Sequence, residues 1–313
     1  MTTEDGNRTG NDDHGRQRLP GTPDPMLRLQ ASGAGMTLAA DRWGPVGATP
    51  VLLLHGGGQT RHAWRGAGET LGDAGYDAYC MDLRGHGDSD WSPDGVYHYT
   101  SFVDDIVGVA GQLGRTPVLV GASLGGICSL LATGEDRRLR PAALVMVDIG
   151  PYVEREGVQR IRGFMQANPD GFASLEEVAD AIAAYQPHRP RPDSLEGLGK
   201  NVRFDTRTGR YHWHWDPAYF ASRRDMSVDE RERRLVEAAR GVGASGIPML
   251  LVRGGLSDVL SLEGAERFLE LVPHAEFVNV TDAAHMVAGD RNDIFAGAVI
   301  EFLQRAAPPG SDS

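Results

Sequence analysis

One short segment constrains the fold of this chain more than any other. Residues 117–131 begin as an apolar run that suits a buried strand and end as a run of small and apolar residues that suits a helix. Residues 121–125 join the two halves with the pattern G-x-S-x-G, which predicts a sharp strand-to-helix turn with the hydroxyl of Ser123 exposed at its tip. Ser123 also lies at the predicted helix N-terminus, where free N–H groups favour negative charge. It is the candidate nucleophile.

Similar apolar runs alternate with helical patterns on both sides of this segment. Buried strands are predicted at 51–54, 76–81, 142–147, 248–253 and 275–280, and weaker edge strands at 26–30 and 36–43 around Gly33 and Gly35. Helices are predicted at about 64–72, 100–113, 262–271 and 292–304. This alternation predicts an α/β fold with a mostly parallel, twisted sheet and helices on both faces.

Two stretches depart from this alternation. Residues 1–25 are polar and rich in Gly, Asp and Pro, which predicts a disordered tail. From residue 151 to about 240, buried strands stop and helical patterns dominate, with a hairpin expected around Thr206 to Arg210. The domain prediction is therefore a core of 26–150 and 241–308, interrupted by a mainly helical inserted cap at 151–240.

Candidate catalytic groups follow the predicted strands, at the edge of a parallel sheet where ligands bind. His285 follows the last strand and is the candidate base. Asp258 follows the strand before it and is the favoured acid, with Asp148 as the alternative. An acid at either position would hold the imidazole in one tautomer and stabilise its charged form. Serine, acid and histidine then occur in the chain order of the α/β-hydrolase arrangement.

Acyl transfer also needs donors for the oxyanion, and two backbone N–H groups are candidates. One belongs to Leu124, directly after the nucleophile, and the other belongs to Gly57 in the His-Gly-Gly-Gly loop that follows the strand at 51–54. A plain glycine turn is the alternative interpretation of that loop. Its position directly after a buried strand favours the oxyanion role.

These motifs together resemble the α/β-hydrolase-fold superfamily, in its group of esterases, lactonases, cofactor-free haloperoxidases and perhydrolases, and epoxide hydrolases. The matching segments are 55–58, 82–89, 121–126, 254–258 and His285-Met286. The resemblance implies the α/β-hydrolase fold, a Ser123-based active site and a structural role for the loop 82–89. Epoxide hydrolases of this group have aspartate at the nucleophile position. The serine in this chain therefore favours acyl chemistry.

Substrate choice is expected to lie in the cap. Tyr211, Trp213 and Trp215 alternate with His212 and His214, so the aromatic side chains would share one face of a strand. Trp213 and Trp215 are candidate substrate-binding residues, and packing of the cap onto the core is the alternative role for them. A zinc site at His212 and His214 is only weakly indicated, because no further ligand cluster is visible. The expected substrate is a small to medium, largely apolar ester or lactone.

Several other functions would use the same residues. A perhydrolase, a carbon–carbon bond hydrolase or an acyltransferase would share the serine, acid and histidine, and a non-catalytic ligand-binding protein would retain only the pocket. No cofactor and no metal are predicted. The expected partner is a small-molecule substrate.

Composition narrows the classes further. The 313 residues are 41% hydrophobic and 24% charged, with a formal net charge of −12, which leaves no basic surplus for nucleic acid. No apolar run reaches the length of a membrane span, and the N-terminus lacks the pattern of a signal peptide. Cys80 and Cys128 lie in apolar stretches, which favours buried thiols and a cytoplasmic location.

Overall fold

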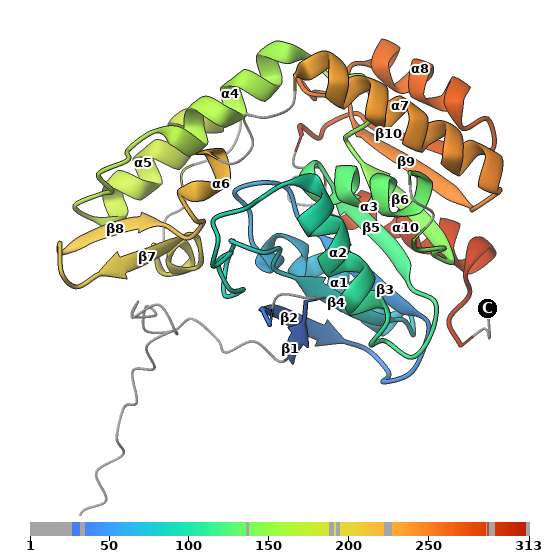
Figure 1. The fold of residues 1–313 in the computed structure, drawn as a ribbon, viewed down its shortest axis with the longest axis horizontal. Coiled ribbons are helices and arrows are strands. Elements are labelled where there is room, and N and C mark those ends of the chain that lie inside the picture. Colours follow the sequence, from blue (N-terminus) through green and yellow to red (C-terminus); the bar gives the residue numbers. More distant parts are fainter. Residues whose placement is uncertain are drawn as a thin grey trace, which may run out of the picture. The chain divides into compact units, whose positions relative to one another are not determined.

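The computed structural model describes residues 27–31, 35–135, 138–187, 191, 195–221, 227–285, 287 and 292–310 (Figure 1). The predicted tail at 1–25, Gly33 and Met286 lie outside the described residues. Chain contacts define two compact units. The small unit contains Gly163–His214, and the large unit contains the described residues before and after it.

An eight-stranded sheet forms the centre of the large unit. Its strands are β1 (Leu27–Gln30), β2 (Thr37–Trp43), β3 (Pro50–Leu54), β4 (Asp77–Met81), β5 (Val118–Ala122), β6 (Ala143–Val147), β9 (Met249–Gly254) and β10 (Glu276–Val280). They lie in the order β1-β2-β4-β3-β5-β6-β9-β10. The pairs β1–β2 and β2–β4 are antiparallel and the others are parallel. The predicted mostly parallel sheet is confirmed.

The central strands are apolar throughout because both faces of the sheet are covered. All five residues of β3 and all five of β6 are buried. Alternate side chains, such as Val51 and Leu53 of β3, pack with Trp64 and Phe295 on one face. That face is covered by η1 (Arg61–Trp64), α1 (Arg65–Asp73) and α10 (Asn292–Ala306). Because the parallel strands run in one direction, their carboxyl ends lie at one common edge of the sheet.

The second face carries four helices that contact one another in sequence. They are α2 (Tyr99–Ala110), α3 (Leu124–Gly134), α7 (Val228–Ser245) and α8 (Leu262–Leu271), with α3 between α2 and α7 (Figure 1). The approach of α3 to α7 is so close that a Cβ on Gly134 would collide with the carbonyl oxygen of Ala238. Helix α7 therefore belongs to the large unit. The cap predicted from the sequence included the part of this helix up to Arg240. The structure gives the insertion narrower limits than 151–240.

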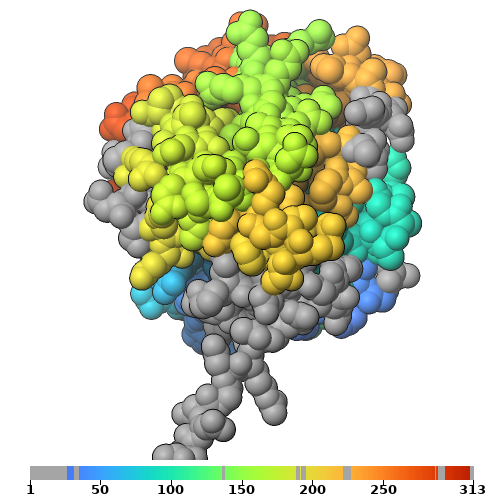
Figure 2. Space-filling view, turned by 90° about the vertical axis from the view of Figure 1, so that its left-hand side faces the viewer, coloured from blue at the N-terminus to red at the C-terminus, as the bar shows by residue number. Residues whose placement is uncertain are grey.

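The small unit has its own packing. It contains the end of α4 (Arg155–Gln166), α5 (Leu175–Tyr185), η2 (Glu196–Asn201) and the antiparallel pair β7 (Val202–Asp205) and β8 (Arg210–Trp213). Ser174 caps α5 by accepting a hydrogen bond from the Glu177 N–H. Figure 2 shows these elements, coloured from yellow-green to gold, next to one another. The expected hairpin around Thr206 to Arg210 is present.

Candidate active site

Ser123 lies at a sharp turn between β5 and α3. Its backbone has φ 46° and ψ −110°, a conformation that costs a non-glycine residue about 1–3 kcal/mol. The turn closes only because glycines flank it, since a Cβ on Gly121 would lie 2.6 Å from the carbonyl oxygen of Gly125. A Cβ on Gly125 would collide with the carbonyl oxygen of Leu54. The sequence pattern at 121–125 therefore has the geometry that it predicted.

Backbone hydrogen bonds join this turn to the neighbouring strand ends. The Ser123 N–H donates to the Val147 carbonyl at 3.4 Å, and the Gly125 N–H donates to the His55 carbonyl at 3.1 Å. Leu124 is the first residue of α3, so its N–H has no acceptor within the helix. Within the described part of the chain, the N–H groups of Leu124 and Gly57 have no hydrogen-bond acceptor. Both N–H groups therefore remain candidate oxyanion donors.

The acid that contacts His285 is Asp148. Its Oδ2 accepts a 2.7 Å hydrogen bond from His285 Nδ1, and its side chain is fully buried. Asp148 follows β6 with φ 51°, and its Oδ1 accepts from the Gly254 N–H at 2.8 Å. The imidazole therefore carries its proton on Nδ1, and Nε2 is left as an acceptor.

The prediction that Asp258 contacts His285 is wrong. Asp258 Oδ2 instead lies 2.6 Å from Arg160 Nη2 on α4, and both side chains are partly exposed. The two acids follow adjacent parallel strands, with Val147 paired to Val252, so both lie at the same sheet edge. Sequence position alone could not separate them because the side-chain direction decides which acid reaches the histidine.

His285 lies in the segment between β10 and α10, and its side chain is 16% exposed. It is held by Asp148. The residue before Asp148 is Val147, whose carbonyl accepts the hydrogen bond from the Ser123 N–H. Among the described residues, no hydrogen bond joins Ser123 to His285. Such bonds are often long in a free enzyme and shorten when substrate binds.

His55 fixes the loop that carries Gly57. The Leu83 N–H donates to His55 Nε2 at 3.0 Å, so the ring proton is on Nδ1, which donates to the Gly56 carbonyl at 2.8 Å. This bond sets the plane of the peptide between Gly56 and Gly57, and thereby the direction of the Gly57 N–H. His55 thus positions a candidate oxyanion donor.

Gln59 closes the same loop from the other side. Its Oε1 accepts from the Gly56 N–H at 2.9 Å, and its own N–H donates to the Gly56 carbonyl at 3.1 Å. Gly58 takes φ 77° within this turn, which glycine adopts readily. A Cβ on Gly56 would lie 3.2 Å from Ser123 Cβ, so the loop and the nucleophile are in close contact.

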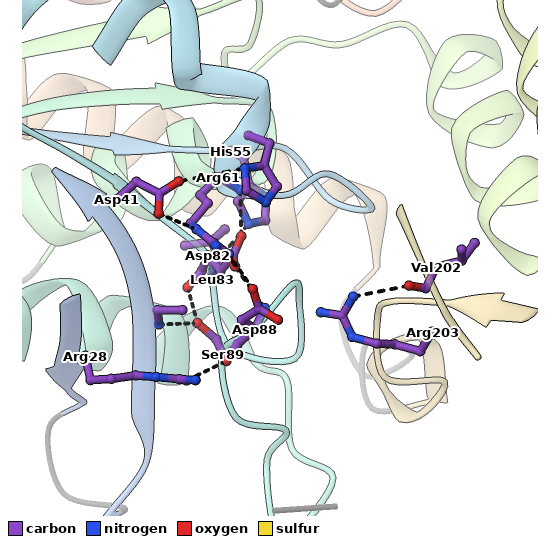
Figure 3. A network of polar contacts seen from close by, with 12 residues as sticks. Arg28, Asp41, His55, Arg61, Asp82, Leu83, Asp88, Ser89, Val202 and Arg203 are labelled. Carbon is purple, nitrogen blue, oxygen red and sulfur yellow. Dashed lines mark hydrogen bonds and ion pairs between the residues drawn. The ribbon is translucent and has the colours of Figure 1, made fainter. Parts of the chain in front are cut away.

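A buried ionic network underlies the loop (Figure 3). Arg61 is fully buried, and its Nη1 lies 2.6 Å from Asp82 and 2.8 Å from Asp88, while its Nε lies 3.0 Å from Asp41. Asp82 also accepts from the backbone N–H groups of Arg61 and Asp88. The network joins the loop after β3 to the loop 82–89. Arg61 could not be identified from the sequence, because its partners Asp41, Asp82 and Asp88 are far from it in the chain and form no recognisable motif with it.

The tryptophans expected to bind substrate are buried. Trp213 is 9% exposed, and its ring lies 4.9 Å from that of Phe172 and 5.3 Å from that of Phe164, all within the small unit. Trp215 is 5% exposed and belongs to the large unit. For Trp213 the structure favours the alternative role of packing. Over the described residues there is no cluster of three potential metal ligands and no helix long and apolar enough to cross a membrane.

We expect His55 to make the folded state less stable as the solution becomes acidic. Burial lowers the pKa of His55 in the folded state, so below its ordinary value of about 6.5 the unfolded chain binds a proton that the fold resists. Stability due to this group is complete above that pH and falls as the pH is lowered. Urea unfolding at pH 8, 6.5 and 5 should show a smaller decrease for His55→Asn than for the wild type. An equal decrease would contradict this assignment.

Comparison with known proteins gives consistent matches. The family model described as alpha/beta hydrolase fold matches residues 49–291. Esterase Rv0045c from Mycobacterium tuberculosis is 28% identical over 280 residues, which cover 87% of each chain. A 2-(acetamidomethylene)succinate hydrolase from Mesorhizobium japonicum is 29% identical over 226 residues, which cover 71% of this chain and 77% of the relative.

Solved structures agree with these sequence matches. The crystal structure of E-2-(acetamidomethylene)succinate hydrolase has a TM-score of 0.76 at 25% identity and covers 89% of this chain and 98% of that protein. The M. tuberculosis esterase Rv0045c has a TM-score of 0.67 at 28% identity, with coverage of 90% and 92%. The similarity therefore extends over most of each protein.

Proposed function

This chain belongs to the α/β hydrolase family, and from that membership we propose that it is a serine hydrolase acting on a small to medium, largely apolar ester or lactone. The observation that carries the proposal is the Asp148–His285 hydrogen bond beside the strained turn at Ser123. A buried carboxylate, an oriented imidazole and a partly exposed serine are the parts that acyl transfer requires. The relatives named an esterase and a hydrolase support the same class of reaction.

In the proposed mechanism, Ser123 Oγ attacks the acyl carbonyl and His285 Nε2 accepts the hydroxyl proton. The N–H groups of Leu124 and Gly57 stabilise the oxyanion. The tetrahedral intermediate then collapses, and His285 donates the proton to the departing alkoxide, leaving an acyl ester on Ser123. Water, deprotonated by His285, cleaves this ester and releases the acid. Asp148 holds the imidazole and stabilises its charged form throughout.

Covalent labelling tests the proposal directly. We expect a fluorophosphonate to add one phosphonyl group per chain, because only an activated serine displaces fluoride at an appreciable rate. Fragment-ion mass spectrometry should place the group on Ser123 and not on Ser129 of the same helix, whose buried hydroxyl donates to the Gly125 carbonyl. The Ser123→Ala variant is the blank. A folded protein that takes up no label, or takes it up elsewhere, would refute the proposal.

The related reactions differ in what receives the acyl group. Added peroxide that diverts product to a peracid would identify a perhydrolase, and an alcohol acceptor that outruns hydrolysis would identify an acyltransferase. A panel of p-nitrophenyl esters of increasing chain length, together with lactones of increasing ring size, should define the acyl group. A preference for the short, uncharged members is expected from the proposed substrate class.

A further inference from the structure

Ser257 lies beside the acid on a turn that follows β9. Its N–H donates to the Gly254 carbonyl at 3.0 Å, which closes the turn. Its hydroxyl oxygen lies 2.5 Å from Asp148 Oδ2. The same oxygen accepts hydrogen bonds from the N–H groups of Val259 at 3.1 Å and Leu260 at 3.2 Å. Ser257 thus makes three polar contacts through a single hydroxyl.

These contacts determine where the hydroxyl proton points. A serine hydroxyl has one proton to donate and two lone pairs to accept with. The two backbone N–H groups occupy both lone pairs, so the proton is left for Asp148 Oδ2. The short oxygen–oxygen distance is that of a hydroxyl donating to a carboxylate.

From this geometry we propose that Ser257 is a positioning residue for the Asp148–His285 pair, holding the carboxylate and reducing the negative charge that it presents to the imidazole. Both oxygens of Asp148 are then held, Oδ1 by the Gly254 N–H and Oδ2 by Ser257 and His285. The effect of Ser257 on catalysis rests on the proposed function as a serine hydrolase.

Other charged groups lie on the elements around this cluster. They include the Asp258–Arg160 ion pair, formed by the loop after β9 and by α4, and the exposed Asp282 on the segment that leads to His285. They also include the buried Arg253 of β9, which donates to the Leu260 carbonyl at 2.8 Å and to Asn279 Oδ1 at 2.8 Å. Among the carboxylates that the structure describes, Asp148 is the one that accepts a hydrogen bond from the imidazole. A change at Ser257 should therefore reach His285 through Asp148.

Removing the hydroxyl should make His285 easier to protonate. In Ser257→Ala, Gly254 still holds Oδ1, so the carboxylate stays in place, but Oδ2 directs its charge to the imidazole alone. We expect the midpoint of the His285 imidazole titration, followed by NMR and assigned with His285→Gln, to rise by about half a pH unit. The low-pH limb of the kcat/KM profile for p-nitrophenyl acetate should move with it, and kcat/KM at its plateau should fall about tenfold.

Two variants separate positioning from simple loss of a loop contact. Ser257→Thr keeps the hydroxyl and should leave the titration midpoint unchanged. Ser261→Ala removes the hydroxyl that accepts from the Gly264 N–H at the start of α8 and should lower the thermal midpoint without moving the His285 titration. Should Ser257→Ala fold poorly, Ser257→Cys retains a weak donor and should show a smaller rise.

An unchanged or lowered His285 midpoint in a folded Ser257→Ala protein would overturn the inference. The NMR titration does not require catalysis, so its result is independent of the labelling of Ser123. If the wild-type protein took up no label on Ser123 while the His285 midpoint rose in Ser257→Ala, only the proposed function would be refuted. If the wild-type protein were labelled on Ser123 while the His285 midpoint stayed unchanged in Ser257→Ala, only the role of Ser257 would be refuted.

Discussion

Replacing Asp148 by asparagine is expected to lower kcat/KM for p-nitrophenyl acetate by about 10⁴-fold. The amide retains the volume and can still accept from Gly254, but it carries no charge to stabilise the imidazolium. It can also present an N–H to His285, which would favour the wrong imidazole tautomer. Steady-state kinetics on protein with an unchanged circular dichroism spectrum measures this effect.

Asp258→Asn is the matched control, since the same chemical change is made at the end of the neighbouring strand. Asp258 pairs with Arg160 at a partly exposed position, where an ion pair is worth about 0–1 kcal/mol. We expect kcat/KM to remain within a few-fold of the wild type. Were the larger loss to occur at Asp258, the pairing seen here between Asp148 and His285 would not be the functional one.

Arg61→Met is expected to lower the free energy of unfolding by about 3–5 kcal/mol at pH 7. Methionine fills much of the same space but leaves Asp82, Asp88 and Asp41 without the cation that they share. Two of these carboxylates are almost fully buried, so water cannot replace the lost partner. Urea unfolding followed by tryptophan fluorescence measures the change.

Arg65→Met provides the comparison for Arg61. Arg65 lies four residues further along and pairs with Glu69 on the exposed surface of α1, so its loss should change stability by no more than about 0.5 kcal/mol. Equal losses in the two variants would mean that burial of the network does not matter. Residual stability of Arg61→Met near the wild-type value would lead to the same conclusion.

The same network should set the acid stability of the fold. Burial is the largest single influence and acts to raise the pKa of Asp82. The charge of Arg61, the neighbouring His55 and the N–H groups of Arg61 and Asp88 together outweigh it and lower the pKa to about 2. The stability from this lowered pKa is complete above the ordinary value of 3.8 and is lost as the pH falls through about 2. In Arg61→Met the lowering should disappear, so the acid-unfolding midpoint should move to higher pH.

Much of the large unit could be predicted from the sequence because its strands are short, apolar and bounded by glycine or proline. The expected strand at 142–147 is β6 at Ala143–Val147, and that at 51–54 is β3 at Pro50–Leu54. Such runs are distinctive because both sheet faces exclude water. The turn at Ser123 was equally predictable, since two glycines and a serine at fixed spacing have few structural uses.

The errors share a physical cause, since they depend on contacts between distant parts of the chain. Helix α7 has a charged face, but it buries Leu235 and Val242 in the large unit. Nothing local to α7 reveals that Gly134 leaves room for it. The acid is a similar case, because the Asp148 carboxylate is contacted by Gly254 and Ser257, which are 106 and 109 residues away in the chain.

The contact between α3 and α7 also has a consequence for chain connectivity. These helices precede and follow the small unit, so forming their contact closes a loop that contains the whole of Gly163–His214. The entropy of closing a flexible loop grows only logarithmically with its length, by about 0.6 kcal/mol for each doubling. The insertion could thus be lengthened, shortened or exchanged at little thermodynamic expense to the sheet. The chain can therefore vary in this segment without any change to the residues that form the serine turn.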